Sequence, residues 1–329
     1  MAKNNMTSRF VKYISTNKDY LITDCISSPM ALNKYPELKK IKEKEKEEVP
    51  ESWGKITWRR FCKNKVAVWS LVLFGAIILM AILAPIISPF DPAQTTGAFD
   101  EGPSAAHLLG TDDVGRDVLS RLIYGSRVSL IVGIGSVVIY AAIGITLGLL
   151  SGYFGGMIDS LIMRITEVFM AYPQFMIILV IVSLIGPNMM TVMLVMGFMG
   201  WPPICRLVRG EVLSIKTQDY ISAAIVTGYS PFTIVFKHIL PNVLSPILVN
   251  CTFGIANAIL TEASLSFLGM GVQPPAASWG NMLTSAQSIM ILSAEPWRWI
   301  PPGIAILIAV LTINFLGDGL NEAIDGDSK

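Results

Sequence analysis

Six long apolar stretches, separated by polar segments, place the tightest limit on the fold of this 329-residue chain. A helix needs about 20 consecutive, mostly apolar residues to cross the hydrocarbon core of a bilayer. The sequence therefore predicts an all-α polytopic membrane protein with six transmembrane helices. We place these spans at residues 66–87, 128–150, 165–185, 189–205, 243–260 and 300–316.

The composition agrees with a lipid-embedded protein and argues against several other classes. Charged residues make up 15% of the chain, whereas soluble domains carry about 25%. The net charge of +1 gives no case for nucleic acid as a partner. No Walker A pattern is present, so we expect no cofactor to be bound by this chain. Its cysteines form no C-x-x-C pair, which argues against a zinc site and against a disulfide framework; they are Cys25, Cys62, Cys205 and Cys251.

The positive charges predict the orientation of the chain. Residues 1–65 are polar and lysine-rich, and further arginines and lysines follow the fourth span. Lysine and arginine favour the cytoplasmic side of a membrane, so both of these regions should be cytoplasmic. We therefore expect a cytoplasmic N-terminal leader at 1–65, a six-span domain at 66–320, outer loops at 88–127 and 270–299, and a cytoplasmic tail at 321–329.

Several residues predict the shape of individual segments. After a turn at 110–115, an apolar pattern that begins at Val118 predicts an interfacial helix before the second span. In the second span, Gly144 and Gly148 have the spacing that lets transmembrane helices pack closely. A short inner turn is expected at 152–164, and the two prolines at 202–203 are expected to end the fourth span.

Three residues in or near the third and fifth spans are unusual for a membrane helix. Glu167 lies three residues after Arg164, and this spacing favours an ion pair over a functional acid. Pro173 is expected to kink its helix, and kinked helices in transporters line cavities. Glu262 lies near the outer end of its span, where a costly acid is a functional candidate. Pro173 and Glu262 are therefore candidates for a pathway across the membrane.

The polar segment 211–241 contains a pattern typical of a short helix followed by a turn. Asp219 can cap a helix that runs to about Thr227. Gly228 suits the left-handed residue that ends such a helix. Small residues share one helical face, which another surface could approach closely; they are Ala223, Ala224, Thr227 and Gly228.

A second helix is expected after this turn. Ser230 and Pro231 have the types preferred at the cap and at the first position of a helix. Pro241 should limit the helix, because a proline pushes the residue before it out of the α region. From the residues alone, the segment is either an ordinary cytoplasmic loop or a docking element.

Four segments give the chain a resemblance to a known family. They are R-R-F-C-K-N-K-V-A-V at 59–68, the segment from Gly110 to Leu130, the 211–241 loop, and the segment from Glu262 to Leu283. The chain resembles the permease subunits of dipeptide, oligopeptide and nickel ABC importers, and more narrowly their C-type permease. In the loop, the residues that fit the family's EAA motif are Ala223, Ala224, Gly228, Leu240 and Pro241. Two positions depart from that motif. Ser222 stands where the motif has a glutamate, and His238 stands where it has an isoleucine.

The resemblance implies a type I ABC importer permease fold and a set of partners. A homologous second permease would complete the pathway as a heterodimer, and two ATPase subunits would bind ATP and Mg²⁺. A substrate-binding lipoprotein or periplasmic binding protein would deliver the substrate to a bacterial cell membrane protein with both ends in the cytoplasm. The helix at about Asp219–Thr227 would seat in an ATPase, with Tyr220, Ser222, Pro231 and the motif residues as coupling candidates.

Other functions remain open at this level. A secondary transporter would favour ionisable residues deep in its spans and inverted repeats, and neither is visible. A membrane enzyme would need a convergent polar site, and the only histidines are His107 and His238. The expected substrate of the importer is a peptide, with nickel or another small solute as the alternative.

Overall fold

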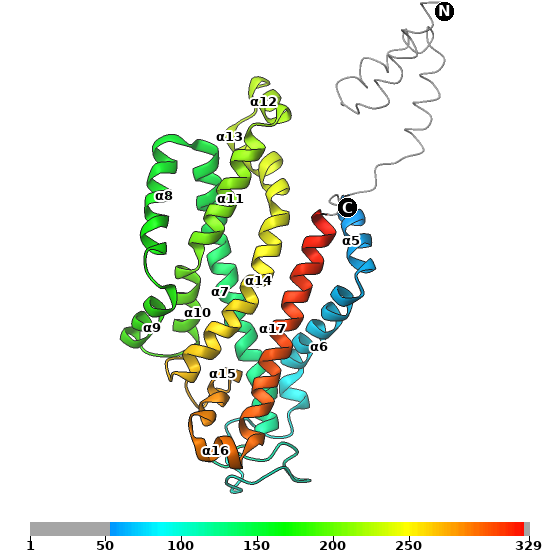
Figure 1. The fold of residues 1–329 in the computed structure, drawn as a ribbon, viewed down its shortest axis with the longest axis vertical. Helices are drawn as coiled ribbons and strands as arrows, with labels where there is room; N and C mark the ends of the chain where they lie inside the picture. Colours follow the sequence, from blue (N-terminus) through cyan, green and yellow to red (C-terminus); the bar gives the residue numbers. More distant parts are fainter. Residues whose placement is uncertain (1–52, 326–329) are drawn as a thin grey trace, which may run out of the picture. The chain divides into compact units, whose positions relative to one another are not determined.

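The computed structural model describes residues 53–325, and the regular elements within that range are helices (Figure 1). The chain divides into two compact units, Met1–Trp58 and Arg59–Lys329. Of the first unit, residues 53–58 are described, and they begin helix α5 (Trp53–Lys63). Most of the predicted leader, residues 1–52, and the last four residues of the predicted tail lie outside the described part. The helices after α5 belong to the second unit.

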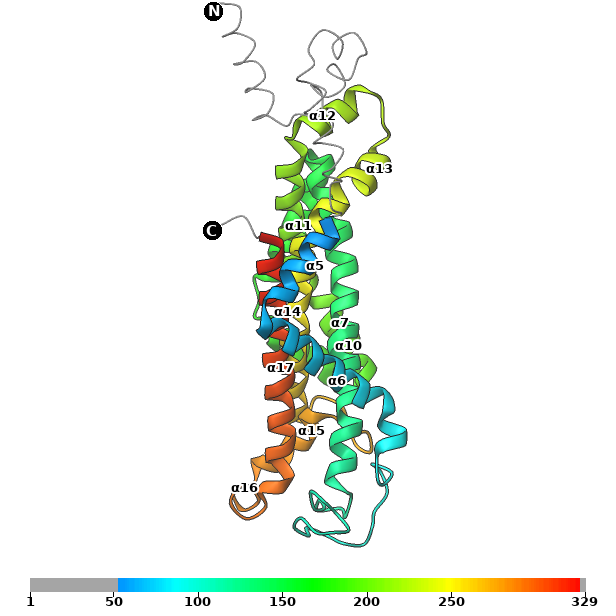
Figure 2. The same ribbon diagram turned by 90° about the vertical axis from the view of Figure 1, so that its right-hand side faces the viewer.

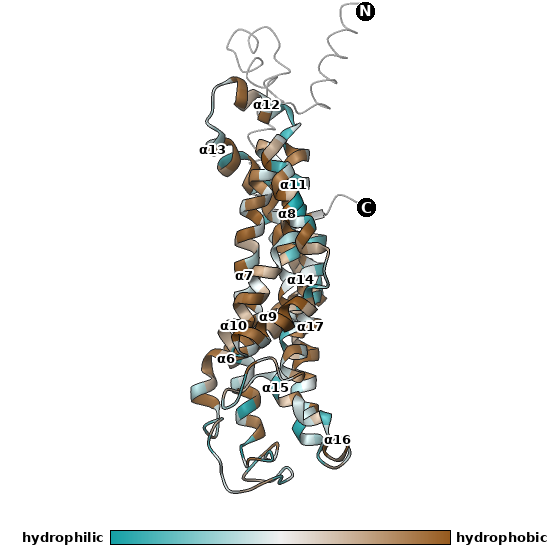
Figure 3. Ribbon diagram, turned by 90° about the vertical axis from the view of Figure 1, so that its left-hand side faces the viewer, coloured by the Kyte–Doolittle hydropathy of each residue, from teal (hydrophilic) through white to brown (hydrophobic). Residues whose placement is uncertain are grey.

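Five helical segments of the described chain are long and apolar enough to cross a membrane. Three are single helices, α6 (Lys65–Ile87), α7 (Val118–Phe154) and α17 (Pro296–Asp325). The fourth joins α10 (Met189–Met199) to α11 (Trp201–Lys216), and the fifth runs from Pro231 to Phe267. A sixth candidate span is the pair α8 (Gly156–Met170) and α9 (Gln174–Ile185), which is bent by 80°. Figure 3 shows that α9 and α10 are almost wholly hydrophobic.

The long helix α7 lies at the centre of this arrangement and contacts α6, α10, α11 and α14 (Leu240–Phe267). Its 37 residues give a length of about 55 Å. Glycines let α11 approach it closely, as the spacing predicted. A Cβ atom on Gly148 would lie 2.7 Å from Cβ of Val208, and one on Gly144 would overlap Ile204. Larger residues at these two positions would push α11 away.

The boundaries of α7 and α8 differ from those predicted. The expected interfacial helix and the second span form one continuous helix, because nothing between Val118 and Phe154 breaks the backbone ladder. The expected inner turn at 152–164 shrinks to Gly155 and Gly156, which both have positive φ. Helix α8 therefore starts at Gly156, nine residues before the expected third span.

The prolines also act differently from the prediction. Pro173 produces a complete break between α8 and α9 and not a kink. Pro202 and Pro203 do not end a span, because they lie in the first turn of α11, where a missing N–H costs nothing.

Pro241 likewise does not end its helix. The chain stays helical from Pro231 to Phe267, through α13 (Pro231–Thr233), a π-helical turn η1 (Ile234–Ile239) and α14. Leu240 N–H donates to the carbonyl of Val235, five residues earlier. This wider turn accommodates a proline that has no N–H of its own to donate. The side-chain amide of Asn242 also donates to the His238 carbonyl over 2.6 Å.

Short helices pack against the other end of the spans. They are α15 (Trp279–Met282), the 3-10 turn η2 (Leu283–Gln287) and α16 (Ile289–Ala294). Trp279 is buried, and its indole N–H donates to the Leu122 carbonyl over 3.0 Å. Figure 2 shows α12 (Asp219–Val226) and α16 at opposite ends of the helices.

Candidate functional site

Helix α12 is present at the predicted place and ends within one residue of the predicted boundary. Its cap differs from the prediction, because Gln218 is the N-cap residue and Asp219 is the first helical residue. Asp219 makes no capping hydrogen bond in this position. Its carboxylate instead lies in the first turn, where a negative charge interacts favourably with the helix dipole.

The turn after α12 has the predicted geometry. Gly228 has φ +82°, and no atom lies within 4 Å of the position of a Cβ atom there. Glycine is therefore required for the backbone conformation and not for lack of space. Ser230 caps the next helix by accepting the N–H of Thr233 over 3.2 Å, and Pro231 holds the first helical position.

The predicted small face is divided between the core and the surface. Ala224 is 6% exposed and packs in a buried cluster with Ile221, Ile234 and Ile239. Ala223 and Thr227 are exposed. The expectation that all the small residues face outward was therefore wrong for Ala224. An eight-residue helix is too short to be stable alone. The packing of Ile221 and Ala224 in this cluster therefore holds α12 against the rest of the chain.

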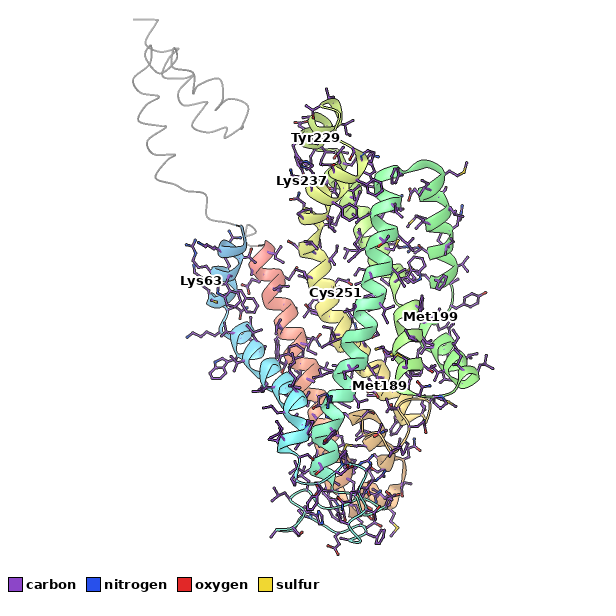
Figure 4. All side chains as sticks on the ribbon, turned by 180° about the vertical axis from the view of Figure 1, so that it is seen from behind. Lys63, Met189, Met199, Tyr229, Lys237 and Cys251 are labelled. Carbon is purple, nitrogen blue, oxygen red and sulfur yellow. The ribbon has the colours of Figure 1, made fainter. Side chains whose placement is uncertain are left out.

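The exposed side of this region consists instead of large apolar residues. Val226 is 87% exposed, and two phenylalanines one turn apart stack with parallel rings. Tyr229, labelled in Figure 4, contacts the ring of His238. We call this set the coupling surface; it comprises Tyr220, Ile225, Val226, Tyr229, Phe232 and Phe236. Most of these residues escaped the sequence reasoning, although large apolar residues in a polar loop are a signal for a binding surface.

Polar contacts attach the base of α12 to the spans. Arg209 of α11 forms two hydrogen bonds of 2.6 and 2.7 Å to the Asp159 carboxylate of α8. Ser151 of α7 donates to the same carboxylate. Lys216, at the end of α11, donates to the Tyr153 carbonyl over 2.6 Å. Helix α11, which precedes α12 by two residues, is thus fixed to α7 and α8.

A cavity of about 460 Å³ lies among α7, α9, α10, α11 and α14. Helix α14 contributes a stripe of residues that recur every three or four positions and therefore share one face; they are Asn250, Phe253, Asn257 and Thr261. Ser136, Tyr140 and Gln174 add further polar groups from α7 and α9. No charged residue is among the described residues that line this cavity.

The two pathway candidates lie in different surroundings. Pro173 does not line the cavity, but the helix that starts after it brings Gln174 and Phe175 to the wall. Glu262 is fully buried and lines neither this cavity nor a second one formed by residues 112–121, 266–291 and Arg298. It accepts hydrogen bonds from Ser266 at 2.7 Å and from Ser129 of α7 at 3.2 Å. In this chain Glu262 thus joins α14 to α7 inside the protein, and its place on a pathway stays a prediction.

The predicted ion pair on the third span is confirmed. The guanidinium of Arg164 lies 3.0 Å from the Glu167 carboxylate, and both side chains are exposed. Within residues 53–325, no group of three or more histidine, cysteine, aspartate or glutamate residues could hold a metal ion.

Comparison with known proteins assigns the family. Residues 144–328 match the family described as binding-protein-dependent transport system inner membrane component. The chain belongs to this family. Residues 52–104 match the N-terminal transmembrane domain of oligopeptide transport permease C. The chain is therefore a multi-pass inner membrane permease and not a catalyst, and a transporter of this class also includes an ATPase and a binding protein.

Curated relatives cover most of the permease. The dipeptide transport system permease protein DppC of Alkalihalophilus pseudofirmus is 40% identical over 83% of this chain and 89% of its own length. The glutathione transport system permease protein GsiD of Pectobacterium atrosepticum is 43% identical over 83% and 90%. Among solved structures, a chain of the inward-facing MetNI methionine ABC transporter aligns with a TM-score of 0.50 and 21% identity. It covers 63% of this chain and 97% of its own, and this likeness shows the ABC importer permease fold.

Proposed function

We propose that this chain is the permease subunit of an ATP-driven importer for dipeptides or oligopeptides, and that a homologous second permease completes its pathway. The uncharged cavity is the observation that carries this proposal. Peptides differ in side-chain charge but share an amide backbone, so amide and hydroxyl groups suit them all. Asn250, Asn257 and Gln174 supply amides at its wall. The names of the curated relatives, which refer to dipeptides and to glutathione, support the same substrate class.

The coupling surface supports docking to an ATPase subunit, which would bind ATP and Mg²⁺. Its apolar side chains stand at the end of the protein, where Lys237 directly follows Phe236 and where no lipid would cover them. Ala224 holds α12 in place from inside. The remaining coupling candidates lie on or beside the coupling surface or at the start of α14; they are Asp219, Tyr220, Ser222, Ala223, Thr227, Gly228, Pro231, Leu240 and Pro241.

The same arrangement supports a cytoplasmic location for both chain ends. The start of α6 and the end of α17 point toward the end of the helices that carries α12 (Figure 1). The coupling segment 211–241 and the tail 321–329 would then face the cytoplasm with the leader 1–65. The loops 88–127 and 270–299 would face outward, where a binding protein delivers the substrate.

Reconstitution tests this function. The chain would be assembled in liposomes with a second permease and two ATPase subunits, and supplied with its binding protein and a radiolabelled dipeptide. We expect uptake that requires ATP and all of these components. The chain alone in the same liposomes is the control. Dipeptide uptake by the chain alone, driven by an ion gradient, would assign it to the secondary transporters.

Nickel is the second candidate for the substrate, and the cavity does not favour it. Nickel sites in proteins use imidazole, thiolate or carboxylate groups. The described residues of the cavity wall include none of these. Adding Ni²⁺ in place of the dipeptide to the same liposomes decides between the two.

A further inference from the structure

A second cavity, of about 870 Å³, lies at the opposite end of the helices from α12. One wall is formed by the loop before α7 and the first turn of α7, from Asp112 to Arg121. The other wall comes from residues 266–291 and from Arg298 at the start of α17. Unlike the membrane cavity, this one contains charged residues, three arginines and two aspartates.

Carboxylates of the protein itself neutralise the positive charge of Arg298. Arg298 is 6% exposed, and its terminal nitrogens lie 2.7 Å from Asp100, 2.9 Å from Asp113 and 2.7 Å from Glu295. Its Nε atom has no hydrogen-bond partner among the described residues. Three carboxylates already surround the guanidinium, however, so a further anion would be repelled here.

Within residues 53–325, Arg121 in contrast has only one carboxylate near its guanidinium, and at a long distance. It is 4% exposed, and its Nη1 atom is buried with no hydrogen-bond partner in the described chain. Its Nε atom lies 3.6 Å from a carboxylate oxygen of Asp112, which is too long for a hydrogen bond. The same oxygen already accepts Nε of Arg116 over 2.8 Å. The other Asp112 oxygen accepts the backbone N–H groups of Val114 and Arg116. Two arginines thus share one carboxylate that is already engaged.

A buried arginine with an unmet donor is costly unless another group completes its hydrogen bonds. The missing group must be an acceptor, and the excess positive charge beside Asp112 favours an anionic one. A carboxylate matches the planar guanidinium in both charge and shape.

The opposite wall supplies groups of complementary character. Its side chains donate hydrogens to backbone carbonyls, Gln273 to Gly269, Gln287 to Phe267 and Thr284 to Asn281. Their oxygen atoms remain available as acceptors for N–H groups of a ligand. The cavity therefore presents a cation on one side and acceptors on the other, which suits a carboxylate and the amide or ammonium groups of the same short molecule.

We propose that this outer cavity binds the transported peptide by its C-terminal carboxylate, which the guanidinium of Arg121 receives before the peptide enters the membrane cavity. The proposal rests on the peptide-import function above. The volume of the cavity lies in the range typical of small-molecule sites. A carboxylate side chain of the binding protein has the same chemistry as the peptide terminus, and the experiment separates the two sources.

The test compares alanyl-alanine with its C-terminal amide in the complete reconstituted importer. Each peptide is loaded beforehand to saturation on the binding protein, so that the selectivity of that protein does not enter the measured rate. The wild-type importer should carry the amide at least about tenfold more slowly, because a hydrogen bond to a charged group is lost. Arg121→Met should lower the rate for the free acid to that for the amide and leave the amide rate unchanged. Arg121→Lys should recover part of the difference.

Arg127→Met is the matched control, because Arg127 is an exposed arginine on the same helix and does not line the cavity. It should carry both peptides as the wild type does. Equal wild-type rates for the acid and the amide would overturn the proposal, and this comparison holds even where Arg121→Met fails to assemble. An equal loss for both peptides in Arg121→Met, with weaker attachment of the loaded binding protein, would assign the carboxylate to that protein. A wild-type importer that carries neither peptide would contradict the peptide-import function itself.

Discussion

The α12 end of the helices and the end that carries α15 and α16 both expose large apolar side chains, and they differ in how their charged groups are enclosed. At the α12 end, large apolar residues such as Val226 and Phe232 are exposed. At the other end, Ile289 and Met290 of α16 are exposed as well, but Trp279 is buried and Arg298 is enclosed by three carboxylates. The first end needs another surface to cover its apolar groups. The second satisfies most of its charged groups within the chain, and Arg121 is the exception that points to a ligand.

The largest expected effect tests whether the α12 end docks to a partner. Val226→Asp places a carboxylate on the most exposed residue of the coupling surface, where a partner would have to desolvate it. ATP-driven uptake should fall at least about 100-fold, as expected for a central interface residue. Melting of the purified chain should not change. Ser214→Asp, an exposed position on α11 outside the coupling surface, is the control for added charge. Normal uptake in Val226→Asp would rule out docking through this residue.

A smaller effect is expected at the opposite end. Arg298→Met removes the cation that holds three acids together, and it should lower the free energy of unfolding by about 2 kcal/mol. This value is below that of a fully buried ion pair, because Asp100 and Asp113 are partly exposed. Thermal melting in detergent measures it. Arg164→Met, which breaks the exposed pair with Glu167, should change stability by about 0.5 kcal/mol or less. Equal effects of the two substitutions would show that the buried cluster has no special role.

The smallest expected effect sharpens the division within α12 itself. Ala224→Leu would overfill the cluster around Ile221 and should destabilise the seat of α12 by about 1 kcal/mol. Hydrogen exchange of the α12 amides should then become faster. Ala223→Leu adds the same side chain to the exposed face, so it should leave exchange unchanged and reduce uptake only through docking. Faster exchange in both variants would mean that the two faces of α12 are not distinct.

Much of the fold followed from local patterns. Apolar length predicted the spans, with the third realised as a bent pair, and the Ser230–Pro231 cap and the Gly228 turn were also predicted correctly. These features depend on residues within one or two turns of one another. The break at Pro173 and the unbroken helix across Pro241 were missed. The effect of a proline depends on whether its neighbours can widen the helix into a π turn, as residues 234–240 do before Pro241.

The sequence by itself determined that the chain lies in a membrane, where its helices run, and which family it resembles. Only the tertiary structure decided which groups meet. It buried Ala224 in the core, joined Glu262 of α14 to Ser129 of α7, and paired Arg298 with three carboxylates while leaving Arg121 beside one carboxylate that is already engaged. The physical reason is distance along the chain. Burial and charge pairing depend on groups that lie far apart in sequence, Arg298 and Asp100 for example, and no local pattern records that they will come together.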